Sequence, residues 1–311
     1  MTVTHRQNNR DAWILADWRR LPTGVGYCRK RGGRRWPAWE KRLLNALLHY
    51  SEPALLAAGV AYSQEILFND WPQLEHLLPS KPAMLETYLA MNPGPRVHPA
   101  LEKAIRDDTD SYPGVRARAA YLYARSAIQG RWDAGEEVIL EATKLVADNS
   151  NDSTTAVAEA AEAYRKVAFG REPWPELVGM IRAGQCHPYF VISYCLRSPL
   201  DLKAEAAEGL LNTPVSDDDA AADPERRRQL AFAAQAYAES MVKGRWKAGE
   251  KLLSGFPFEM CCYAQFTLKQ PLPDHLHTEM MMRNCETPHD PDIKNYFAWC
   301  KEWATIARVP A

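Results

Sequence analysis

The sequence predicts an all-α protein built as an array of degenerate helix-hairpin repeats, α-solenoid-like, with a basic N-terminal segment in front of it. Three observations lead to this fold. A motif recurs along the chain, apolar residues follow the helical period, and strand-like segments are almost absent. The motif carries the prediction furthest, because it marks the ends of successive helices.

Composition is typical of a folded protein inside the cell. The chain has 311 residues, of which 46% are hydrophobic and 25% charged, and it contains ten tryptophans. No apolar run is long enough to span a bilayer, and the N-terminus lacks the apolar core of a signal peptide. We therefore expect a cytoplasmic protein with no membrane segment, whose seven cysteines are reduced thiols, most of them in the core.

The N-terminal segment differs from the rest of the chain in its charge. Residues 1–42 hold eleven Lys and Arg against three Asp and Glu, a net charge of +8, whereas the remaining residues carry −9. We recognise no copy of the repeated motif before Leu43. The sequence therefore predicts two domains, a basic N-terminal arm over 1–42 and a helical-repeat domain over 43–311.

The repeated motif is clearest in two copies. Residues 123–136 read YARSAIQGRWDAGE, and residues 237–250 read YAESMVKGRWKAGE. A third copy over 62–75 keeps Tyr, Trp and Glu at the same spacing, and a fourth over 164–175 is shifted by small insertions. A match of this length is not chance, and we expect each copy to form one helix hairpin.

Each position of the motif has a physical role. The residue seven after the Tyr is Gly or Asn, the two residues that best accept the left-handed conformation ending a helix. Pro72 and Pro175 directly follow a Trp, and proline suits the first turn of a new helix. The Trp therefore lies at a helix–helix corner, and the paired residues Arg131/Glu136 and Arg245/Glu250 are expected to be solvated. The predicted structural residues are Tyr62, Asn69, Trp71, Tyr123, Gly130, Trp132, Trp174, Tyr237, Gly244 and Trp246.

Apolar periodicity supports helices between the corners. Segments 154–169 and 224–243 each carry an apolar stripe at helical spacing. Segment 189–196 has a strand-like composition, but no second strand is evident to pair with it. We therefore predict a short buried helix there.

The motif resembles the degenerate helical repeats of bacteriophage and bacterial mobile-element proteins, whose copies contain a similar Tyr-Ala, Gly-Arg-Trp and Glu pattern. The resemblance covers residues 43–303, with two good copies and several worn ones. It implies a helical scaffold of phage-like origin. This group has no common catalytic residues to carry over.

The basic arm is the best candidate for a nucleic-acid contact. Its cluster surrounds a flexible Gly-Gly pair and combines positive charges for phosphates with a ring for base stacking. The candidate residues are Arg29, Lys30, Arg31, Arg34, Arg35 and Trp36. The alternatives are that the arm docks on the acidic body or stays solvated.

Metal binding and catalysis receive less support. Zinc-competent residues lie near the C-terminus at His275, His277, Cys285 and His289, but their spacing matches no recurrent zinc motif. No phosphate-binding loop, dinucleotide fingerprint, HExxH or GxSxG is found. Cys186 and His187 are adjacent in sequence, which seldom brings two side chains together. We expect no cofactor, metal or catalytic residue.

These observations rank three functions. The first is a non-enzymatic scaffold that presents an extended surface to another protein, a host factor if the phage resemblance holds. The second is a nucleic-acid-associated protein that uses the basic arm. The third is an enzyme or metalloprotein with a dispersed site.

Overall fold

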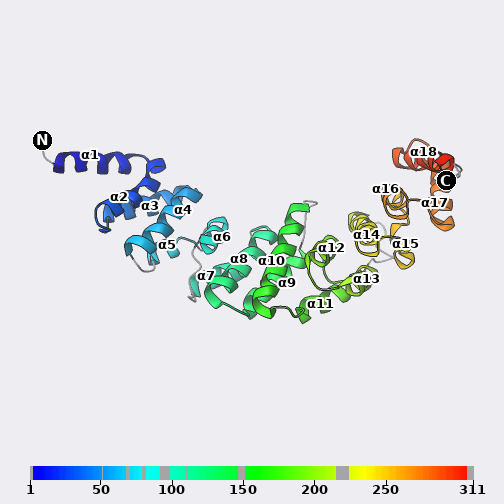
Figure 1. Cartoon of the computed structure of the whole chain (residues 1–311), viewed down its shortest axis with the longest axis horizontal. Helices are drawn as coiled ribbons and strands as arrows, with labels where there is room; N and C mark the ends of the chain where they lie inside the picture. The colour runs from blue at the N-terminus through cyan, green and yellow to red at the C-terminus, as the bar shows by residue number, and fades with distance from the viewer. Residues whose placement is uncertain are drawn as a thin grey trace. The chain divides into compact units, whose positions relative to one another are not determined.

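The computed structural model confirms an all-α fold (Figure 1). It describes residues 3–50, 52–67, 71–78, 82–91, 99–108, 111–145, 151–214 and 224–306. These residues form helices and the turns between them, with no strand among them.

The chain forms two compact units, which we call the first and the second unit. The first contains residues 1–142 and 163–170, and the second contains residues 143–162 and 171–311. Elements of the first unit are α1 (Val3–Ala16), η1 (Trp18–Thr23), α2 (Gly24–Lys30), α3 (Pro37–His49), α4 (Pro53–Tyr62), α5 (Pro72–Glu75), α6 (Pro82–Met91), α7 (Pro99–Asp107) and α8 (Pro113–Tyr123). Helices α9 (Asp133–Lys144) and α10 (Asn151–Phe169) contribute residues to both units. Those of the second unit are α11 (Pro175–Arg182), α12 (Pro188–Arg197), α13 (Lys203–Asn212), α14 (Pro224–Tyr237), α15 (Glu250–Leu253), α16 (Pro257–Cys262), α17 (Asp274–Glu286) and α18 (Pro291–Ile306).

Proline begins many of these helices, as the sequence predicts. Helices α5 and α11 start at Pro72 and Pro175, directly after Trp71 and Trp174. Helix α12 covers the strand-like segment 189–196 and also starts at a proline, so the prediction of a short helix there is confirmed. The missing N–H of proline costs nothing in a first turn, where that group has no intrahelical partner.

The conserved spacing of the motif corresponds to a shared set of hydrogen bonds, which we call the corner. At Trp132 the backbone N–H donates to the hydroxyl of Tyr164 at 2.9 Å, and that hydroxyl donates to Glu136 at 3.0 Å. Arg131 pairs with the same carboxylate at 2.8 Å. The first residue of the motif, Tyr123, packs its ring against that of Trp132, with 4.7 Å between the ring centres.

The second unit contains a matching corner at Trp246. Its N–H donates to Tyr263 at 2.9 Å, and Glu250 accepts from Arg245 at 2.6 Å. Glu136 and Glu250 are only 5% and 3% exposed, so the expectation that these carboxylates are solvated was wrong. They are buried because the tyrosine of a later helix closes over them.

A further corner lies inside the basic segment, where sequence reasoning saw no copy. Trp36 N–H donates to the Tyr62 hydroxyl at 2.7 Å, and Tyr62 donates to Glu40 at 2.7 Å. Arg35 completes the set by pairing with Glu40 at 2.8 Å. The boundary predicted at residue 42 falls inside α3, which packs against α4, and both helices belong to the first unit.

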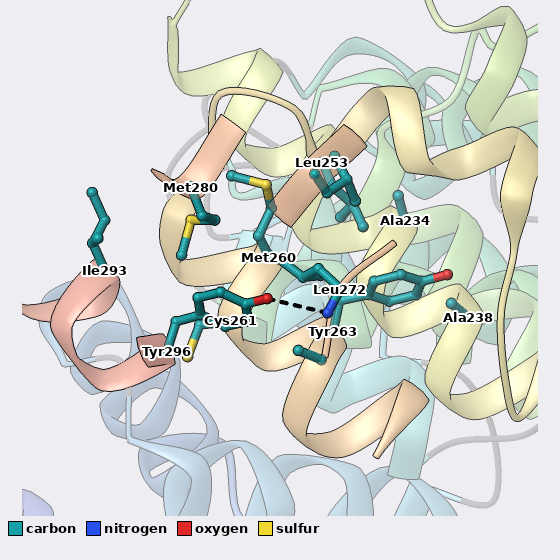
Figure 2. Close-up of a cluster of buried hydrophobic side chains, with 12 residues drawn as sticks. Ala234, Ala238, Leu253, Met260, Cys261, Tyr263, Leu272, Met280, Ile293 and Tyr296 are labelled. Carbon is teal, nitrogen blue, oxygen red and sulfur yellow. Dashed lines mark hydrogen bonds between the residues drawn. The ribbon is translucent and has the colours of Figure 1, made fainter. Parts of the chain in front are cut away.

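The core at the C-terminal end of the second unit has a variant of the corner, shown in Figure 2. Leu272 takes the place of Trp, and its N–H donates to the Tyr296 hydroxyl at 3.2 Å. Met260, Tyr263 and Met280 pack around this bond with almost no exposure. A tyrosine hydroxyl thus caps the start of a helix even where the tryptophan is missing.

The left-handed residues at the helix ends are not the predicted glycines. Positive φ values belong to Gln129 (58°), Lys243 (56°) and Lys269 (53°), and Gly130 and Gly244 do not share them. The turn before Gln129 is π-helical, and both Gln129 and Gly130 donate their N–H groups to the carbonyl of Ala124. These two bonds place the left-handed residue at Gln129, one position before the glycine that the motif suggested. Asn69 lies outside the described residues.

A different glycine of the motif is fixed by packing. A Cβ at Gly135 would lie 2.2 Å from the Trp132 ring, whereas a Cβ at Gly130 meets nothing within 4 Å. Helix propensity alone favours alanine over glycine by about 1 kcal/mol at Gly135, which lies in α9, whereas Gly130 lies outside the helices. At Gly135 the clash with a buried ring reverses that preference.

We therefore expect Gly135→Ala to lower the free energy of unfolding by about 1–3 kcal/mol. Gly130→Ala, five residues away, is the control and is expected to change it by less than about 0.5 kcal/mol. Urea denaturation followed by circular dichroism measures both. Equal effects from the two substitutions would contradict the packing role of Gly135.

Candidate functional site

The predicted nucleic-acid residues are mostly engaged within the first unit. Arg29 pairs with Glu65, Arg31 lies 3.5 Å from Asp11, and Arg35 pairs with Glu40. Burial disfavours ionisation of Glu40, but hydrogen bonds from Arg35 and Tyr62 outweigh it and lower the pKa of that carboxyl. These pairs make Arg29 and Arg35 structural residues.

Trp36 does not offer a stacking surface. Its side chain is 8% exposed and its backbone N–H is bonded to Tyr62, so the prediction that this ring stacks on a base is corrected. By contrast Lys30 and Arg34 are exposed, and no carboxylate of the described residues lies within 4 Å of either.

Other rings of the same segment are exposed, and sequence reasoning missed them. Trp13 on α1 is 50% exposed, with the Arg20 guanidinium 4.5 Å from its ring centre. Trp18 stacks on Tyr50 at 4.6 Å with an interplanar angle of 18°, and Arg19 lies over Trp18 at 5.2 Å. The available signal was the presence of two tryptophans within a few residues of Arg19 and Arg20.

The second unit exposes a group of aromatic side chains on adjacent helices, which we call the aromatic face: Tyr189, Phe232, Phe258 and Phe266. Helix α12 packs against α14, and α14 packs against α16. Tyr189 of α12 contacts Phe232 of α14 edge to face at 5.1 Å. The phenylalanines are 37%, 47% and 57% exposed in chain order.

Helical spacing indicates that these phenylalanines share one side of the unit. Cys262 lies four residues from both Phe258 and Phe266, and Glu239, which is near enough to affect the pKa of its thiol, lies about two turns after Phe232 along its helical segment. Burial raises the pKa of the Cys262 thiol, with Glu239 adding to the shift. The aromatic face therefore extends from α12 across α14 to the π-helical turn after α16.

An exposed charge borders the aromatic face. Arg228 of α14 is exposed and lies 3.8 Å from Glu259 of α16, which is only 4% exposed. Burial raises the pKa of Glu259, and it also raises that of Asp292, to which neighbouring Asp290 contributes. An apolar centre with a polar rim is the composition of many protein–protein interfaces.

A polar cavity of about 180 Å³ lies in the second unit at the start of α12. Its lining residues are Lys144, Gln185, Cys186, His187, Pro188, Glu225, Arg226 and Gln229. Cys186 and His187 both line the cavity, so a catalytic thiol with a histidine base would have to form here.

Cys186 and His187 do not form that pair. The Cys186 thiol contacts the Thr143 hydroxyl at 3.5 Å, and burial raises the pKa of the thiol to about 11. Burial also lowers the pKa of His187, whose Nδ1 accepts from the Tyr189 N–H. Nε2 therefore carries the proton and donates to Gln229 at 2.9 Å. A protonated thiol and an occupied imidazole give no activated nucleophile.

The histidines near the C-terminus are also engaged separately. His275 lies 3.4 Å from Glu250, and His277 is hydrogen-bonded to the Tyr296 hydroxyl. Cys285 and His289 are exposed. The described residues contain no group of three or more His, Cys, Asp or Glu side chains arranged to hold a metal ion.

In the part of the chain that the structure describes, no helix has both the length and the hydropathy needed to cross a membrane. Comparisons of the chain with protein-family models, with curated proteins and with solved structures find no match.

Proposed function

We propose that the chain is a non-enzymatic protein-interaction scaffold, built as an array of helix-hairpin repeats, and that the aromatic face binds another protein. The observation that carries this proposal is the exposure of Phe232, Phe258 and Phe266 on neighbouring helices. Aromatic rings are enriched at the centres of protein interfaces, because each buries a large apolar area with few rotatable bonds.

The recurring corners support the repeat architecture. Each uses its Trp N–H, its Tyr hydroxyl and its Glu carboxylate to hold one helix start against a later helix. Each repeat of such an array contacts only its neighbours, so further repeats extend the surface, and helical arrays bind large partners on this extended surface. The polar and aromatic residues of the motif are therefore structural, and binding falls to side chains outside the motif.

The resemblance to phage and mobile-element proteins leads us to propose a host protein as the partner, encountered in the cytoplasm. Phe232, Phe258 and Phe266 predict that this partner offers an apolar patch. The exposed Arg228 beside the face predicts that the partner has a polar rim of its own. Neither catalysis nor a cofactor is part of this function.

The test is affinity capture from nuclease-treated host lysate, followed by titration of the purified partner. The serine variant of the face carries Phe232→Ser, Phe258→Ser and Phe266→Ser, and the control carries Tyr112→Ser, Met281→Ser and Met282→Ser. All six residues are exposed large hydrophobics, so both variants lose similar exposed apolar area. We expect the face variant to weaken binding at least about tenfold, since interface aromatics commonly contribute 2 kcal/mol or more.

Capture alone does not establish the proposal. It holds if the face variant loses the partner while the control retains it, with both variants folded by circular dichroism. Equal retention by the two variants, or no partner after nuclease treatment, would contradict it.

A further inference from the structure

A second surface, in the first unit, has a different chemistry from the aromatic face. Here guanidinium groups alternate with aromatic rings. Arg31 and Arg10 lie 5.6 Å and 5.5 Å from the centre of the Tyr27 ring, on α2. Arg10 and Trp13 are three residues apart on α1, so they lie on one side of that helix. Arg20 then covers Trp13 at 4.5 Å.

A neighbouring stack repeats this chemistry. The Arg19 guanidinium lies over the Trp18 ring, and Trp18 stacks on Tyr50 with 4.6 Å between the ring centres. Helix α1 packs against η1, which carries Trp18, Arg19 and Arg20. The two stacks therefore belong to one region, formed by α1, η1 and the end of α3.

Two rings of this region, Trp13 and Tyr50, are more exposed than a structural role requires, whereas Tyr27 is 8% exposed. Trp36 and Trp39, which build the core of the same unit, are 8% and 0% exposed. Trp13 is 50% exposed and Tyr50 is 42% exposed. A ring with half of its surface in water retains apolar area that a ligand can cover.

Some cations of this region are less neutralised than the paired arginines Arg29 and Arg35. Arg10 and Arg19 contact rings and have no carboxylate within 4 Å among the described residues, whereas Arg20 lies 3.9 Å from Asp17 and Arg31 lies 3.5 Å from Asp11. Lys30 next to Arg31 is exposed and likewise unpaired in the described part of the chain. A cation that contacts a ring keeps its charge available to an anion.

We propose that the surface formed by α1, η1 and the ends of α2 and α3 binds single-stranded nucleic acid, with a base stacked on Trp13 and phosphates held by Arg10, Arg19, Arg20 and Lys30. An acidic protein would satisfy the charges but has no need of exposed rings. A duplex hides its base faces, so the rings favour single strands. Stacking on a ring accepts any base, so we expect little sequence preference.

The test is fluorescence anisotropy of the full chain with a labelled oligothymidylate of about 15 nucleotides, the upper range for one such surface. Titrations between about 50 and 200 mM salt give the slope of log affinity against log salt. Trp13→Ala is expected to weaken binding about tenfold with little change of slope, because stacking releases no counterions. Trp13→Phe keeps a ring and is expected to restore most of the affinity.

Charge variants separate this surface from the paired cations. Arg19→Gln with Lys30→Gln is expected to reduce the slope by roughly one unit, since each phosphate contact releases about 0.7 counterion from a single strand. Arg29→Gln is the matched control, because the Arg29 charge is already neutralised by Glu65, and its slope is expected to stay unchanged.

Several outcomes would overturn the proposal. They are the absence of binding at the lowest salt, equal affinity for the duplex, or a Trp13→Ala variant that folds normally by thermal melt and binds with unchanged affinity. If polyglutamate of equal charge displaces the probe and Trp13→Ala leaves the affinity unchanged, the partner would instead be an acidic protein. None of these results bears on the aromatic face of the second unit.

Discussion

Replacement of Trp39 by alanine is expected to lower the free energy of unfolding by about 3–5 kcal/mol, the usual cost of truncating a fully buried tryptophan. Trp39 has no exposed surface, and its indole N–H donates to the Leu21 carbonyl at 2.9 Å. Its ring contacts Tyr62 at 4.6 Å and stacks near Trp71 at 6.4 Å. The Trp39 side chain on α3 thus contacts η1 through Leu21, α4 through Tyr62, and Trp71 at the start of α5.

Urea denaturation followed by circular dichroism measures this loss, and Trp13→Ala is the control in the same unit. Trp13 is half-exposed, so its removal is expected to cost less than about 1 kcal/mol. Deletion of residues 1–42 removes Trp36, Trp39 and Glu40 from Tyr62 and is expected to destabilise the unit as well. A melt unaffected by Trp39→Ala and by the deletion would show that the basic segment is a separate arm after all.

Replacement of Glu136 by alanine is expected to lower the free energy of unfolding by about 1–3 kcal/mol, because it removes a buried, charged acceptor from the corner. Glu136 is buried and accepts from the Tyr164 hydroxyl at 3.0 Å and from Arg131. Glu137, the next residue, is exposed, so Glu137→Ala is the matched control and is expected to have an effect below about 0.5 kcal/mol.

A double-mutant cycle tests whether the corner acts as a unit. Tyr164→Phe removes the hydroxyl that links Glu136 to the Trp132 N–H. The double variant is expected to cost about 1–2 kcal/mol less than the sum of the two single losses, because residues in one hydrogen-bond network are coupled. Additive losses would mean that Glu136 and Tyr164 stabilise the fold independently.

The candidate surfaces could be located from the sequence only in part. The charge count drew attention to residues 1–42, where the proposed nucleic-acid surface lies, because clustered cations are visible without a fold. It selected Trp36, which is buried, and passed over Trp13, which is exposed. The aromatic face gave no sequence signal, since Phe232, Phe258 and Phe266 are separated along the chain and meet only through the packing of α14 against α16.

The sequence by itself determined the helical class and the positions of the helix starts. Both depend on neighbours in the chain, namely apolar periodicity and proline in the first turn after a tryptophan. Only the tertiary structure decided which carboxylates are buried and that the basic segment belongs to the first unit. Those outcomes depend on two tyrosines. Tyr62 bonds to Trp36, 26 residues earlier in the chain, and Tyr164 bonds to Trp132, 32 residues earlier. Local periodicity carries no information about partners at that distance, because burial is fixed only when a second helix covers the first.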